Sequence, residues 1–265
     1  MSMSYGGLYP VNFQNKSMTL DIPVTITNTQ NVSTPAPFQQ MIQFNPSSYF
    51  PFLRSDLSNI RFTDENYNPV PAWLESYSST NAILWVNLSN GIQANQSVTI
   101  HMLIPLAGFS FDGQFWGEAP QLSPTYGQYD SGASVFSNYW NFAGTTLPSG
   151  WVSGSGITAT VNNGLNISGS NDGTVYYNSF STQSPFIIEA DFYPNTPSIG
   201  TGIMAEYGQT GSDMYNGYLF WMSPTFAIYY IEESSGVSFT VISASGTASQ
   251  VQQILSGDVG NGYQA

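Results

Sequence analysis

His101 is the only histidine of this 265-residue chain, and the chain has no cysteine. A single imidazole without thiolates cannot supply the ligands of an ordinary zinc site. A Ser/His/Asp triad would have to pass through His101, and no GxSxG nucleophile elbow occurs in the sequence. We therefore expect His101 to hydrogen-bond a neighbouring side chain, and we expect no catalytic residue and no enzymatic activity.

Glu189 and Asp191 are the carboxylates whose spacing comes nearest to a catalytic pair. They lie two residues apart in IIEADFYP and so share one face of a predicted strand. Paired carboxylates are the groups that glycoside hydrolysis uses. A solvated strand face is the alternative interpretation, and the one we favour.

Asp172 and Asp213 are the candidate metal ligands, because each lies in a predicted loop beside Asn and Gly, in GSNDGT and QTGSDMYNG. Oxygen-rich loops of this kind suit a hard cation such as calcium. The sequence NDG is also typical of a hairpin turn. Turn chemistry is the favoured interpretation, with calcium as the alternative, and no other cofactor is expected.

Aromatic residues are abundant, with 6 Trp and 17 Tyr, and flat rings can stack on sugars. The rings expected to be exposed enough for glycan binding are Trp116, Tyr126, Tyr215 and Tyr218. Packing in a core or between domains is the alternative for all four. Five N-x-S/T sequons, at Asn15, Asn31, Asn87, Asn95 and Asn166, permit glycosylation without arguing for it, since about that number is expected by chance.

Charge is scarce throughout the chain. Only 7% of residues are charged, and 16 acids against 3 bases give a net charge of −13. A nucleic-acid partner is excluded, because phosphate binding needs a Lys/Arg patch. Protonation of the acids would leave little self-repulsion, so the composition predicts an exterior protein in an acidic, hot setting. A secreted protein with a bland polar surface at neutral pH is the alternative.

The elements that must position these residues are short strands, since 25 Gly, 16 Pro and runs of Val, Ile, Thr, Tyr and Phe occur without sustained helical periodicity. The fold class predicted is all-β, with two β-sandwich domains. Residues 1–20 form an N-terminal arm and 21–105 the first sandwich. Alternating apolar residues predict its half-buried strands, in one run Ile22, Val24 and Ile26 and in another Val98, Ile100, Met102 and Ile104.

A spaced set of residues within this first sandwich has the pattern of a known family. The set comprises Ile60, Arg61, Phe62, Thr63, Asp64, Pro71, Trp73, Glu75, Ser76, Trp85, Val86, Ser97, Thr99 and Ile100. It resembles the family known as domain of unknown function 2341. The resemblance covers about positions 20 to 105. It implies a β-sandwich of bacterial and archaeal surface proteins, and it implies no activity.

Residues 106–135 lack periodicity and read as an aromatic, Gly- and Pro-rich linker, whose Phe109, Phe111, Phe115 and Trp116 are expected to pack on a neighbouring domain. From 136 to 265 the chain resembles concanavalin-like (laminin-G-like) jelly rolls. The residues that carry this likeness are Phe142, Gly144, Leu147, Pro148, Gly150, Trp151, Val161, Gly164, Leu165 and Ile167. The strands that would close such a jelly roll are not evident. Glycosidases of this fold carry a third acidic residue after the positions of Glu189 and Asp191, and this chain has Pro194 there.

These observations predict a non-enzymatic structural and attachment module outside a prokaryotic, in the first place archaeal, cell or on the exterior of a virion. Expected partners are its own subunits, other surface or virion proteins, and glycans. A glycan-binding lectin-like module is the alternative, and a glycosidase fragment the weakest one. No membrane-spanning run and no signal peptide are evident. We expect the N-terminal arm to cover a sheet edge, within the chain or in a neighbouring subunit.

Overall fold

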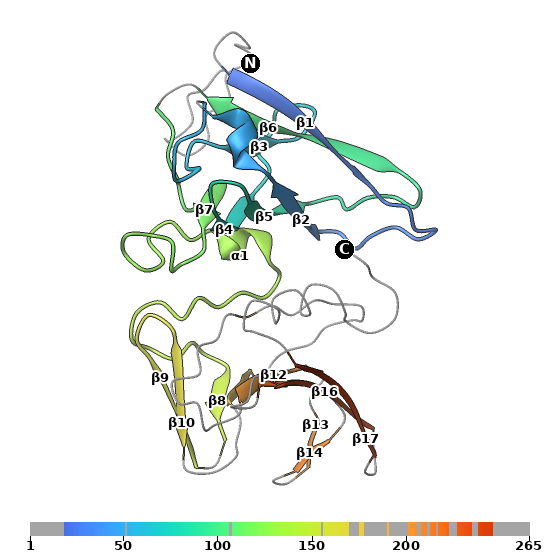
Figure 1. The fold of residues 1–265 in the computed structure, drawn as a ribbon, viewed down its shortest axis with the longest axis vertical. Coiled ribbons are helices and arrows are strands. Elements are labelled where there is room, and N and C mark those ends of the chain that lie inside the picture. Colours follow the sequence, from blue (N-terminus) through green and yellow to red (C-terminus); the bar gives the residue numbers. More distant parts are fainter. Residues whose placement is uncertain are drawn as a thin grey trace. The chain divides into compact units, whose positions relative to one another are not determined.

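The computed structural model describes residues 19–50, 52–105, 108–154, 156–169, 175–177 and 190, and the backbone of six strands between residues 201 and 245. The chain divides into two compact units, Met1–Ser179 and Phe180–Ala265, each described here by itself (Figure 1). In the described residues the α-helical content is α1 (Gly132–Val135), a single turn, and the rest of the regular structure is almost entirely β. The predicted all-β fold class is confirmed.

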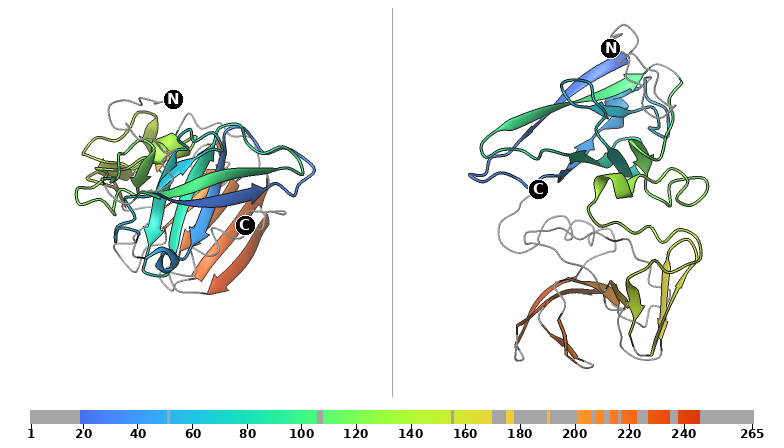
Figure 2. Two further views of the ribbon diagram at one scale, coloured as in Figure 1. Left: turned by 90° about the horizontal axis from the view of Figure 1, so that it is seen from above. Right: turned by 180° about the vertical axis from the view of Figure 1, so that it is seen from behind.

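Two sheets make up most of the first unit. One has the order β1-β6-β3, from β1 (Thr19–Thr27), β6 (Ser97–Pro105) and β3 (Arg61–Thr63). The other has the order β2-β5-β4-β7, from β2 (Phe38–Phe44), β5 (Ala82–Leu88), β4 (Ala72–Tyr77) and β7 (Trp116–Glu118). Seen from above, β1 and β6 run across the strands of the second sheet (Figure 2). The layers therefore pack as a crossed sandwich.

The alternation predicted for β1 and β6 sets the inner face of the first sheet. Ile22 pairs with Met102 and Val24 with Ile100, and both pairs face the core shared by the two sheets. The second sheet contributes aliphatic residues to the same core, among them Leu74, Leu84 and Val86, all with no exposed surface. The period of two along each strand thus decides which residues are buried.

The second sheet also has a covered outer face, which carries Trp73 and Trp85. These two residues are direct partners in the β4–β5 register, which shifts between Leu74 and Ser76 at a β-bulge containing Glu75. A bulge re-aims the side chains of its strand, and here Glu75 accepts a hydrogen bond from the Trp85 indole. Residues 129–139, including α1, lie over this face.

The stretch predicted to be a linker contains part of the sandwich itself. Within it, β7 pairs in parallel with β4, and the following chain returns so closely that a Cβ atom on Gly117 would meet the Tyr129 carbonyl oxygen at 2.1 Å. Phe111 and Trp116 are buried, as expected for aromatic residues of this stretch. The predicted boundaries at 20, 105 and 135 stay predictions.

Two small two-stranded antiparallel sheets follow in the first unit. One joins β9 (Ile157–Val161) to β10 (Leu165–Gly169), and the other joins β8 (Trp151–Ser153) to β11 (Val175–Tyr177). Trp151 contacts the rings of Trp140 and Phe142, with centroids 5.3 and 5.0 Å apart. Contacts between aromatic rings therefore join β8 to the chain segment that precedes it.

The second unit is described as backbone alone. A four-stranded antiparallel sheet has the order β12-β15-β16-β17, from β12 (Thr201–Ala205), β15 (Gly217–Met222), β16 (Ala227–Ser234) and β17 (Ser238–Ser245). A hairpin pairs β13 (Gly208–Thr210) with β14 (Asp213–Tyr215). The concanavalin-like architecture of residues 136–265 stays a prediction.

Candidate functional site

Asp130 is the most heavily hydrogen-bonded carboxylate in the described part of the chain. It precedes α1 and accepts hydrogen bonds from the Trp73 indole at 2.9 Å, the Gly132 amide at 2.9 Å, the Tyr139 hydroxyl at 2.8 Å and the Asn141 side chain at 2.6 Å. These donors come from β4, from the start of α1 and from the segment after it. One carboxylate therefore ties the covering segment to the sheet beneath.

Tyr139 is held as a neutral donor in this cluster. Burial raises the pKa of its phenol, and the nearby charge of Asp130 raises it further. A Cβ atom on Gly132 would meet the Tyr139 ring at 2.2 Å, so the ring lies against the backbone of α1. The phenol is consequently neutral and donates to both oxygens of Asp130.

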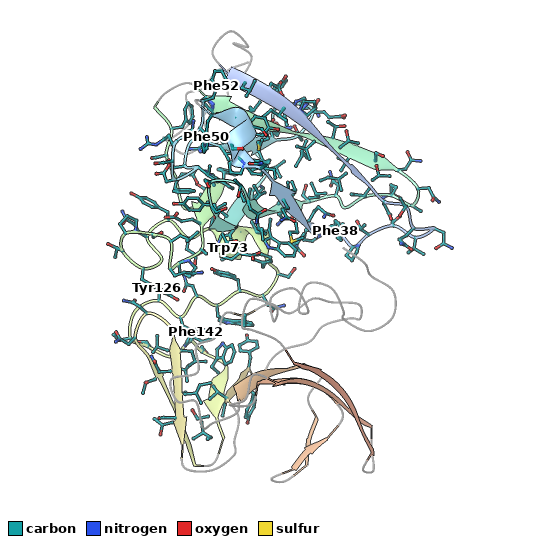
Figure 3. The ribbon with its side chains drawn as sticks, in the orientation of Figure 1. Phe38, Phe50, Phe52, Trp73, Tyr126 and Phe142 are labelled. Carbon is teal, nitrogen blue, oxygen red and sulfur yellow. The ribbon has the colours of Figure 1, made fainter. Side chains whose placement is uncertain are left out.

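A small cavity of about 220 Å³ opens beside this cluster. Its walls include Asp130, Tyr139, Trp140, Asn141, Phe142 and Pro148. Tyr126, predicted to bind glycans, is half-buried next to it and donates its hydroxyl proton to the Asn141 carbonyl oxygen at 2.7 Å; Figure 3 labels Tyr126 and Phe142. Aromatic faces with a few polar groups are a common lining for small-molecule sites.

His101 lies on the outer face of the first sheet and forms the hydrogen bond that we expected. Its Nδ1 atom is 2.7 Å from Asp21 Oδ1, and the Tyr67 hydroxyl donates to Asp21 Oδ2 at 3.1 Å. The rings of Tyr67 and His101 stack with centroids 5.4 Å apart. The cluster joins β1, β6 and the loop after β3, which gives the imidazole a structural role.

Trp116 does not have the exposure predicted for a glycan-binding ring. Its side chain is fully buried and its indole donates to the Leu57 carbonyl oxygen at 3.1 Å. The expectation was wrong because β7 places this ring inside the core between the sheets. Tyr215 and Tyr218 lie on β14 and β15, and Asp213 begins β14, but their side chains are outside the described residues.

The other predicted carboxylates, Asp172, Glu189 and Asp191, also lie outside the described residues. Across the residues that are described, no group of three His, Asp or Glu side chains is arranged to hold a metal ion. Calcium binding by Asp172 and Asp213 stays a prediction.

The sequons differ in accessibility. Asn31, Asn95 and Asn166 are exposed, and Asn15 is outside the described residues. Asn87 is half-buried, and its side-chain amide already donates to the Ser134 carbonyl oxygen at 3.0 Å beneath α1. A glycan on Asn87 would have to displace α1 from the sheet.

The residues around the cavity were missed by sequence reasoning, although a signal for them exists. Tyr139, Trp140, Asn141 and Phe142 are consecutive, and a run of three aromatic residues with an amide is unusual in a loop. Asp130 carried no local signal, because its partner Trp73 is 57 residues away.

Comparison with known proteins finds two likenesses. Residues 56–108 match the family described as domain of unknown function (DUF2341), which agrees with the likeness seen in the first sandwich. The chain is also 34% identical over 203 residues to "Uncharacterized protein 562" of Sulfolobus islandicus rod-shaped virus 1, an alignment covering 71% of this chain and 35% of that protein.

The chain therefore spans about a third of the length of the curated relative that it matches. No solved structure matches the chain. Among the described residues, no helix has the length and apolar character needed to cross a membrane.

Proposed function

We propose that this chain is a non-enzymatic structural and attachment module on the exterior of an archaeal virion or of a prokaryotic cell. The observation that carries the proposal is the use of polar side chains in the first unit. Asp130 and Glu75 bind indoles, Asp21 binds His101, and Asp112 accepts three backbone amides of its own loop. These carboxylates, which are of a type that can act in catalysis, form hydrogen bonds that stabilise the fold.

The likeness to a protein of a rod-shaped archaeal virus supports the viral part of this proposal. The scarcity of charge supports the acidic setting, because protonation of 16 acids would leave only 3 Lys and Arg, one His and the amino terminus charged. A protein with this composition is suited to a surface that must stay folded in acid.

Immunogold electron microscopy tests the exterior location. An antiserum raised against the purified chain would be applied to intact particles and intact cells of the source organism, with lysed samples as the control. We expect gold on the outside of intact particles or cells. Labelling that appears only after lysis would contradict the proposal.

Glycan binding is the second candidate, and the cavity beside Asp130 is the observation that favours it. Trp140 and Phe142 line this cavity together with the carboxylate of Asp130 and the amide of Asn141. These are the groups that a sugar ring needs, an aromatic face and directional polar partners. The volume of about 220 Å³ suits one small ring rather than a long chain.

A glycan array tests this second candidate. Trp140→Ala should remove any binding signal that the full-length protein gives, while Ile167→Ser, at an exposed position on β10, should leave it unchanged. The array would be run with calcium and with a chelator, so that a contribution of Asp172 and Asp213 is measured separately. Binding retained by Trp140→Ala would exclude this cavity as the site.

A further inference from the structure

An apolar groove lies at one end of the first sandwich and shares no lining residue with the cavity beside Asp130. It has a volume of about 530 Å³, and its lining includes Phe50, Leu53, Leu57, Tyr77 and Ser79. Leu53 and Leu57 belong to the main core, so the groove opens directly onto the top of that core.

The rim of the groove combines exposed aromatic rings with Ser55, Ser78 and Ser79. Phe50 is 47% exposed and Tyr77 37%, and the nearby Phe52 is 46% exposed (Figure 3). Clustered exposed aromatics on a soluble domain mark an interaction site rather than ordinary surface. The groove is therefore a candidate docking surface.

The chain enters β1 at this end of the sandwich, at Thr19. Thr19 is the register partner of Pro105. The side-chain amide of Asn59 donates to the Pro105 carbonyl oxygen at 3.2 Å and to the Phe52 carbonyl oxygen at 3.0 Å. A single side chain thus separates the end of β6 from the rim of the groove, and residues 14–18 could span about 17 Å when extended.

The composition of residues 1–18 matches the groove. The segment contains the apolar residues Tyr5, Leu8, Tyr9, Val11 and Phe13, and its one charged side chain is the basic Lys16. The rest of the chain is acidic. At the groove, the pKa of Tyr77 is raised by burial and then by the charges of Glu118 and Asp56. Lys16, just outside residues 5–13, would add an attraction to these carboxylates, although Asp56 is already paired with Arg54 at 3.6 Å.

We propose that residues 5–13 of the same chain bind in this groove and extend the core of the first sandwich. The segment then covers the groove, whereas the sequence led us to expect that it covers a sheet edge, within the chain or in a neighbouring subunit. The edge at β1 needs no cover, because Asp21 and Pro23 lie on β1, and an acidic side chain and a proline both discourage further strand pairing.

Disulfide trapping in the full-length chain tests the proposal cleanly, because the protein has no cysteine of its own. The test pair is Asn12→Cys with Ser79→Cys, both replacing polar residues, the second exposed on the groove. The control pair is Asn12→Cys with Val32→Cys. Val32 is 60% exposed and follows Thr27, the far end of β1, which lies about 26 Å from Thr19 along the strand.

Under mild oxidation with glutathione, we expect the Ser79 pair to form an intramolecular disulfide at least about tenfold faster than the Val32 pair. Adding Leu8→Ser and Phe13→Ser should reduce the rate of the Ser79 pair to that of the control. Equal rates for the two pairs would overturn the proposal. So would a mainly intermolecular product, which would place the segment of a second copy in the groove.

Discussion

The two faces of the β2-β5-β4-β7 sheet are held by different forces. The inner face packs aliphatic side chains such as Leu74, Leu84 and Val86 against the first sheet. The outer face carries Trp73 and Trp85, and each indole donates to a carboxylate, Asp130 and Glu75 respectively. Apolar packing contributes stability without direction, whereas a hydrogen bond to a carboxylate specifies where its partner must lie.

This difference explains how a short irregular segment can cover a sheet. Residues 129–139 contain only one turn of helix, so their own secondary structure cannot position them. Phe136 inserts between the two indoles, with ring centroids 5.3 Å from Trp73 and 5.5 Å from Trp85. Rings fill the space, and the carboxylate of Asp130 fixes the register of the segment.

A substitution that disrupts packing on the inner face should cause the largest loss of stability. Leu84→Ala removes a side chain with no exposed surface from the centre of the core. We expect a loss of about 2–5 kcal/mol in the free energy of unfolding, from lost burial and the cavity left behind. Chemical denaturation measures it, and Ile167→Ala at an exposed position is the control. A loss no greater than that of the control would mean that the sheets do not pack as described.

A substitution that disrupts the hydrogen bonds on the outer face should cause a smaller loss of stability. Asp130→Asn keeps the shape of the side chain but removes its charge and one acceptor from Tyr139 and Asn141. Hydrogen bonds to charged groups contribute about 1.5–3 kcal/mol, so we expect a loss of about 2 kcal/mol. Glu65→Gln, at an exposed carboxylate, is the matched control. A change equal to that control would contradict the role given to Asp130.

The inner face was largely predictable from sequence, and the outer face was not. Alternation identified Ile22, Val24 and Ile26 as core residues because the period of two is local. The pairing of β7 with β4, which places Trp116 inside the core, was missed, because composition cannot show that a Gly- and Pro-rich stretch returns to the sheet. The hydrogen bond from Trp73 to Asp130 likewise depends on a fold that joins distant segments.

Glu118 provides a contrast with Asp130, because it is a carboxylic acid buried at the end of β7. Burial raises its pKa, the hydrogen bond from Ser123 opposes this, and the charge of Asp56 adds to the increase. The stability that it contributes is therefore present at low pH and lost as the pH rises through the raised pKa. Glu118→Gln should stabilise the protein at pH 7, by less than Asp130→Asn destabilises it.

The pH dependence of stability shows whether Glu118→Gln stabilises the protein by removing the charge of Glu118 or by some other change in the fold. The difference in free energy of unfolding between Glu118→Gln and the unchanged protein should shrink as the pH falls below the ordinary value of 4.5. Urea denaturation at pH 7 and at about pH 3 measures the difference. A difference that stays constant with pH would contradict the assigned cause.

Salt should have the smallest effect, because neither face of the sheet depends on exposed charge pairs. Arg54 and Asp56, 3.6 Å apart, form an exposed pair of the kind that contributes little. We expect the free energy of unfolding to change by less than about 0.5 kcal/mol between about 0.05 and 1 M sodium chloride. A larger decrease at high salt would show that charges contribute more than the structure indicates.

Amide hydrogen exchange on Asp130→Asn tests most directly whether this carboxylate fixes the covering segment. We predict faster exchange at Glu118, Ser134 and Phe136, whose amides donate within the cover and to it, with β1 and β6 still protected. Leu84→Ala should instead speed exchange throughout both sheets. Unchanged exchange in Asp130→Asn, or a loss of protection spread equally over β1 and β6, would contradict the account.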